Sequence, residues 1–115
     1  MELDLDYARS VICAEAEAIA SMTPIINGQF ARAAEMIYRC PGSCIVSGIG
    51  KAGIIGRKIS ATLASTGTPS HFLHPAEAVH GDLGRLRDDD IVLILSYGGE
   101  TDEVIRLINL VKQRQ

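Results

Sequence analysis

The sequence is short of positive charge and has no basic segment. Its 11 Lys and Arg residues are outnumbered by 14 Asp and Glu residues, and the formal net charge of -3 is spread along the chain. Nucleic acids and anionic membrane surfaces are bound by clustered basic side chains. Neither kind of partner is therefore expected, and a small-molecule partner is favoured.

Export and membrane signals are lacking as well. The first residues, MELDLDYARS, are acidic where a secretion signal is basic, and no apolar run approaches the roughly 18 residues that a membrane span needs. The cysteines, Cys13, Cys40 and Cys44, are odd in number, and the last two lack the CxxC spacing of a zinc pair. We expect a cytoplasmic protein with reduced, buried thiols.

Apolar residues, in contrast, are plentiful: they make up 47% of the 115 residues, enough for the core of one domain. They recur at helical spacing over residues 3–26, and a second short helix is predicted from Gly28 to a stop at Pro41-Gly42. Residues 1–41 are therefore predicted to form a helical lead-in.

Residues 42–115 repeat one pattern three times, in which a short apolar run ends in small polar residues and then gives way to helical spacing. The predicted strands are 43–47, 70–73 and 91–95, and the helices that follow begin near Ala52, Pro75 and Thr101. A wholly apolar run such as IVLIL is typical of a parallel sheet covered on both faces. The pattern predicts a three-layer α/β/α, Rossmann-like fold, with polar loops at the carboxyl ends of the strands.

The first polar loop, GIGKAG, has the GxGxxG spacing of a dinucleotide site at Gly48, Gly50 and Gly53. Such a site places an acid about 20 residues further on to hold the ribose, but His74 stands in that region here. The loop also lacks the GK-[ST] ending of a Walker motif. The glycines alone indicate that the backbone closely approaches an anion or a neighbouring helix.

The third polar loop runs from Ser96 to Thr101, between a buried strand and a helix, and its hydroxyls and glycines suit a phosphate group. Small residues allow backbone N–H groups to point inward, and a helix N-terminus favours negative charge. The structural alternative is that Thr101 simply caps its helix.

Taken together, the elements GIGKAGIIGRKISATLASTGTPS, HPAEAVHGDLG and SYGGETDEV resemble the sugar isomerase (SIS) domain of the arabinose 5-phosphate isomerase family. The resemblance covers nearly the whole chain. It implies interconversion of D-ribulose 5-phosphate and D-arabinose 5-phosphate, on the route to the Kdo sugar of lipopolysaccharide. It also implies dimers with active sites across the interface, so we expect a homo-oligomer in which the helix over residues 3–26 makes contacts.

By position, the resemblance implies catalytic roles for Lys51 and Glu103. The substrate contacts that it implies are Gly67, Thr68, His80, Ser96, Gly99, Glu100 and Thr101, the last four belonging to the phosphate loop. His74 matches a position that can hold zinc, which inhibits rather than serves the reaction, so no cofactor is required. In an enediol mechanism Glu103 would act as acid/base and Lys51 would stabilise the oxyanion.

The chain departs from the family pattern in two ways. Ala52 and Gly98 stand where family members usually have Ser, which removes hydroxyl donors from both phosphate loops. The further strands of the SIS domain, with another Glu and a His, are not present, so we expect a partial domain with a truncated sheet. A non-catalytic sugar-phosphate-binding module is the alternative function.

The remaining charged and titratable residues are assigned structural roles. His71 is expected to be structural, Arg57 and Lys58 to lie on a helix surface, and residues 88–90 (three aspartates) to form a solvated turn before the third strand.

Overall fold

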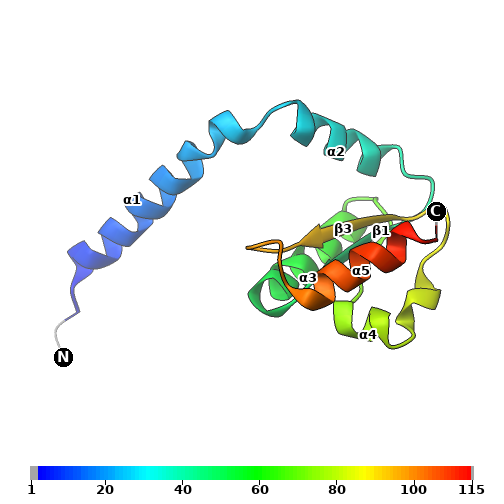
Figure 1. Ribbon diagram of the computed structural model, residues 1–115. Coiled ribbons are helices and arrows are strands. Elements are labelled where there is room, and N and C mark those ends of the chain that lie inside the picture. Colours follow the sequence, from blue (N-terminus) through cyan, green and yellow to red (C-terminus); the bar gives the residue numbers. More distant parts are fainter. Residues whose placement is uncertain (1–2, 115) are drawn as a thin grey trace. The chain divides into compact units, whose positions relative to one another are not determined.

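The computed structural model describes residues 3–114, and the chain divides into two compact units, Met1–Glu35 and Met36–Gln115 (Figure 1). None of the helices formed by residues 3–114 combines the length and the apolar character needed to cross a lipid bilayer.

The described residues of the first unit, 3–35, are mostly helical and all exposed, so they form no core of their own. Helix α1 (Leu5–Ser21) begins after Asp4, whose carboxylate accepts the backbone N–H of Tyr7 at 2.9 Å, a standard N-cap. It is shorter than the predicted 3–26 helix, because Pro24 cannot continue it and a 3-10 turn, η1 (Thr23–Ile25), follows. No residue described in α1 or η1 is buried.

Helix α2 (Gly28–Tyr38) leads into the second unit and stops before Pro41-Gly42, as predicted. Beyond it lie strands β1 (Cys44–Gly48), β2 (Ser70–Phe72) and β3 (Ile91–Leu95). They form one parallel sheet in the order β2-β1-β3, with Cys44 in register with Ser70 and Ile91. The central strand, β1, is buried along its whole length. The α/β prediction is confirmed.

Helices cover both faces of this sheet. On one face, α3 (Gly50–Ser65) lies against Val46 and Phe72, and a Cβ added at Gly56 would lie 3.1 Å from the Phe72 ring. The other face carries α4 (Pro75–Val79), the 3-10 turn η2 (Asp82–Arg85) and α5 (Asp102–Lys112). Its core is formed by Ile45, Leu73, Ala78, Leu86 and Leu107.

Strand β3 is half-buried at every position, which differs from the expectation that IVLIL would be covered on both faces. Within residues 3–114, β3 pairs with β1 alone and therefore forms an edge of the described sheet. Its apolar composition is that of an inner strand.

The cysteines only partly match the expected buried thiols. Cys44 is buried, and burial together with nearby Cys40 raises the pKa of its thiol, so it stays protonated and inert. Cys40 is half-buried, with its Sγ 3.3 Å from the Asp89 carbonyl oxygen, and Cys13 is exposed. The expectation was therefore wrong for Cys13, which lies on α1.

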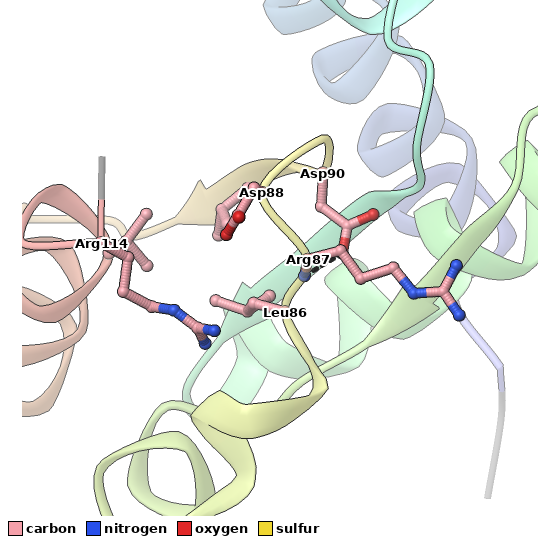
Figure 2. A pocket seen from close by; sticks show the side chains of 7 residues that line it. Leu86, Arg87, Asp88, Asp90 and Arg114 are labelled. Carbon is pink, nitrogen blue, oxygen red and sulfur yellow. Dashed lines mark hydrogen bonds between the residues drawn. The ribbon is translucent and has the colours of Figure 1, made fainter.

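The turn before β3 is held to the segment before β1 by hydrogen bonds at the amino edge of the sheet. We call this set of bonds, among residues 42–43 and residues 87–90, the clasp. Asp90 accepts the backbone N–H groups of Ser43 and Arg87, each at 2.8 Å, and the second of these bonds is drawn in Figure 2. The solvated turn predicted for residues 88–90 was thus wrong for Asp90, because its carboxylate satisfies two loop donors. Gly42 donates to the Asp89 carbonyl at 3.1 Å.

Replacing Gly42 tests this clasp. A Cβ at this position would lie 2.6 Å from both the Asp89 carbonyl oxygen and Asp90 Oδ1. Gly42→Ala should therefore lower the free energy of unfolding by about 1–3 kcal/mol, measured by urea denaturation. Gly84→Ala is the matched control, since nothing lies within 4 Å of its added Cβ. Equal stabilities of the two variants would contradict the clasp.

Candidate functional site

The candidate site lies at the carboxyl ends of the strands. A cavity of about 410 Å³ opens between the loop after β1 and the loop after β3. Lys51, Ser96 and Thr101 all line it, and its other lining residues are Ile49, Ala52, Leu95, Tyr97, Gly98 and Val104. The structure therefore brings together three of the residues predicted from sequence.

Glycines shape the first loop. A Cβ at Gly53 would lie 2.6 Å from the Gly48 carbonyl oxygen, so these residues allow α3 to start directly against the end of β1. Gly50 has a φ of 60°, which favours glycine. The residue before α3, Ile49, makes no side-chain capping bond. The first N–H groups of α3 therefore lack a side-chain cap at the cavity, and exposed Lys51 lies in the same turn.

The third loop is a tight turn held by Ser96. Its Oγ accepts the backbone N–H of Gly99 at 2.9 Å, and Gly99 has a φ of 72°. Because this oxygen is the acceptor, the hydroxyl hydrogen of Ser96 remains available for donation. Thr101 occupies the N-cap position of α5, but its side chain makes no capping bond. Simple side-chain capping by Thr101 is therefore not observed.

Two acidic residues, one in this loop and one just after it, lie outside the lining of the cavity. Glu100 is exposed, and Glu103 is exposed in the first turn of α5, where a carboxylate is favourable for the helix dipole. The catalytic role of Glu103 stays a prediction.

The second loop is organised by His74. Its Nδ1 accepts the backbone N–H of Ala76 at 3.2 Å, which makes it the N-cap of α4 and places the proton of the neutral ring on Nε2. Binding of a metal at Nε2 would move that proton to Nδ1 and break the cap. Residues 3–114 contain no cluster of three or more His, Cys, Asp or Glu side chains suited to a metal. The described residues alone therefore do not form a complete zinc site around His74. His80, at the other end of α4, is exposed.

Gly67 and Thr68 lie apart from the cavity. They precede β2, and the carbonyl of the next residue, Pro69, accepts the N–H of Cys44 at 2.8 Å, at the amino edge of the sheet. Gly67 has a φ of 99°, and Thr68 donates to the Leu63 carbonyl, so this segment forms the C-terminal stop of α3. The substrate role of these two residues stays a prediction.

A second cavity, of about 370 Å³, lies near the start of β3 and the end of α5 (Figure 2). Its polar lining mixes Arg87 and Arg114 with Asp88 and Asp90, so it has no excess of positive charge for an anion. The Arg114 guanidinium also donates to the Leu83 carbonyl. This cavity is not a candidate for a phosphate.

One buried polar residue was not recognised from sequence as part of this region. Ser47 is fully buried at the end of β1, and its Oγ donates to the Leu73 carbonyl at 2.5 Å. The signal was a hydroxyl inside an otherwise apolar strand. The structural role of His71 stays a prediction, and its Nε2 is buried without a hydrogen-bond partner among the described residues.

The unpartnered nitrogen predicts that His71→Phe stabilises the fold. The change replaces a buried polar atom with carbon at similar volume, so the free energy of unfolding should rise by about 1 kcal/mol in urea denaturation. His80→Phe, the same change at an exposed position, should alter it by less than about 0.5 kcal/mol. A clear loss of stability in His71→Phe would show that Nε2 has a partner, such as a buried water.

Comparison with known proteins agrees with this architecture. The SIS domain profile matches residues 36–115. Arabinose 5-phosphate isomerase KdsD of Yersinia pestis is 49% identical over 107 residues, which are 93% of this chain and 33% of that protein. KdsD of Pseudomonas aeruginosa is 46% identical over an alignment of 116 positions, which covers 98% of this chain and 36% of that protein. The chain thus spans about a third of the length of the curated relatives it matches.

Solved structures show the same fold. A Bacteroides fragilis protein assigned as a phosphosugar isomerase superposes with a TM-score of 0.89 at 36% identity, over 96% of this chain and 59% of that one. An E. coli CFT073 protein, solved in complex with arabinose 5-phosphate, gives a TM-score of 0.84 at 38% identity, over 97% of this chain and 61% of that one. Since the SIS profile matches most of its residues, this chain belongs to the SIS domain family.

Proposed function

We propose that the chain is the sugar-phosphate-binding part of an isomerase that interconverts D-ribulose 5-phosphate and D-arabinose 5-phosphate. One observation carries the proposal: Lys51, Ser96 and Thr101 line a single cavity between the N-terminal ends of α3 and α5, neither of which has a side-chain cap. Relatives named arabinose 5-phosphate isomerase, and an E. coli neighbour in complex with arabinose 5-phosphate, support the choice of substrate.

The phosphate fits the loop between Ser96 and Thr101. Free N–H groups at the start of α5, the Ser96 hydroxyl hydrogen and the Thr101 hydroxyl are all donors for phosphate oxygens. The helix dipole adds favourable electrostatics for a dianion. Because Ala52 and Gly98 offer no hydroxyls, backbone N–H groups carry more of the binding here than in family members with Ser at those positions.

The reaction moves a proton between C1 and C2 of the sugar through an enediol. Among the described residues, Lys51 is the only cationic side chain that lines the cavity, and its ammonium suits the oxyanion that develops on the carbonyl oxygen. Glu103 is the proposed acid/base that carries the proton between the two carbons. These steps need no metal. We propose that zinc at His74 inhibits, because it would recruit further ligands from the substrate-binding loops.

A non-catalytic sugar-phosphate-binding module is the second candidate function. One observation favours it: Glu103 does not line the cavity. Turnover by the protein distinguishes the two candidates, since both bind the same phosphate.

We also propose that the protein is a homo-oligomer that uses the apolar side of α1. Ile12, Ile19 and Met22 recur at helical spacing and are at least half exposed, at 69%, 65% and 50%. Such a stripe is stabilised when a second copy covers it.

Ile19→Glu should therefore lower the association state seen by sedimentation, because it places a charge in the apolar stripe. Glu17→Lys, a change of charge elsewhere on α1, is the control and should leave association intact. A monomeric wild-type protein at high micromolar concentration, or equal association of both variants, would contradict this surface.

The catalytic assignments predict distinct kinetic effects. Lys51→Ala and Glu103→Gln should each lower kcat by about 10²-fold or more, because both groups act on charge that develops in the transition state. Thr101→Val should mainly raise KM, because the phosphate is bound equally in ground and transition states. The measurement is steady-state isomerisation of D-arabinose 5-phosphate, after folding has been checked by circular dichroism.

Near-wild-type kcat in both Lys51→Ala and Glu103→Gln would contradict the catalytic roles proposed for these two residues. It would leave the chain as a phosphate-binding scaffold, which is the second candidate function.

A further inference from the structure

A buried hydroxyl joins two of the three loops. Ser47 and Leu73 are both fully buried, and the Ser47 Oγ donates to the Leu73 carbonyl at 2.5 Å. Ser47 precedes Gly48 and the glycine loop that leads to Lys51, whereas Leu73 precedes His74. The bond therefore connects the chain at the points where it leaves β1 and β2.

The connection continues beyond Leu73 into α4. The His74 Nδ1 accepts the N–H of Ala76 at 3.2 Å, and the His74 carbonyl accepts the N–H of Ala78 at 3.0 Å. Helix α4 is only five residues long and ends at His80, so few bonds of its own fix its direction. Its orientation is set by the packing of Pro75 and Ala78 in the core and by how firmly Leu73 and His74 are held.

We propose that Ser47 is a positioning residue, whose hydroxyl sets the place of the His74 loop and α4 relative to the Lys51 loop. It touches no substrate in this scheme. It acts through the Leu73 carbonyl, and its effect on sugar binding rests on the proposed function and on the substrate contact predicted from the sequence for His80.

A second serine gives a matched control. The Ser70 Oγ donates to the Cys44 carbonyl at 2.6 Å, so it also links β1 and β2 through a hydroxyl and a strand carbonyl. Ser70 lies at the start of β2, at the amino edge of the sheet, away from the three loops. A bond that only supports the sheet should matter similarly at either edge, whereas a positioning bond should affect the loops from Ser47 alone.

The experiment compares Ser47→Ala with Ser70→Ala by two measurements. The first is steady-state isomerisation of D-arabinose 5-phosphate, in which Ser47→Ala should raise KM by about two- to tenfold with kcat nearly unchanged. The second is ¹⁵N NMR of the His74 imidazole at about pH 8, with EDTA present. Acceptance at Nδ1 predicts the Nε2–H tautomer in the wild type and a mixture of tautomers in Ser47→Ala.

Ser70→Ala should leave both KM and the His74 tautomer as in the wild type. If Ser47→Ala does not fold, Ser47→Cys keeps the size and a weaker donor, and should shift both quantities in the same direction by less. Unchanged KM and tautomer in the folded Ser47 variant, or equal changes in both serine variants, would overturn the proposal. If the wild type shows no turnover, the catalytic assignment fails for this chain and KM gives no readout, and the tautomer measurement alone decides the role of Ser47.

Discussion

Parallel pairing of β1 with both of its neighbours is the constraint on which this structure depends. β1 is buried along its length, and its register with β2 and β3 starts all three strands at one edge of the sheet. Because all three strands run in the same direction, the loops that follow them meet at the opposite edge. The shared cavity of Lys51, Ser96 and Thr101 follows from that alignment. The same alignment separates Gly67 and Thr68 from it, since they enter β2 from the other edge.

The electrostatic character of the site follows from how its helices begin. Most helix N-termini are satisfied by a side chain such as Asp4, which caps α1. At α3 and α5 the preceding residues, Ile49 and Thr101, make no such bond, so unpaired N–H groups and the positive end of each dipole remain at the cavity. Lys51 adds a full charge in a turn where it is otherwise unfavourable. An anionic ligand would accept hydrogen bonds from the unpaired N–H groups and would balance the positive charge of Lys51. Both effects favour a phosphate at this site.

Sequence reasoning succeeded where a local pattern determines the outcome. The IVLIL run predicted the bounds of β3, and Pro75 predicted the start of α4. It failed where the outcome depends on contacts between distant residues. Asp90 looked like part of a solvated turn, but its partner Ser43 lies 47 residues away, and the bond between Ser47 and Leu73 spans 26 residues. The partial exposure of β3 could not be predicted from its composition either. The strand is wholly apolar, as an inner strand would be, but it lies at the edge of the described sheet.

The central claim is that the N-termini of α3 and α5 bind the phosphate of a five-carbon sugar. Titration of the ¹⁵N-labelled protein with D-arabinose 5-phosphate, followed by backbone amide NMR, tests it most directly. We expect saturable shifts concentrated at residues 49–52 and 96–103, and similar but weaker shifts with inorganic phosphate at the second of these segments. Absence of saturable shifts, or shifts concentrated around Arg87 and Arg114 in the cavity at the other edge of the sheet, would contradict it.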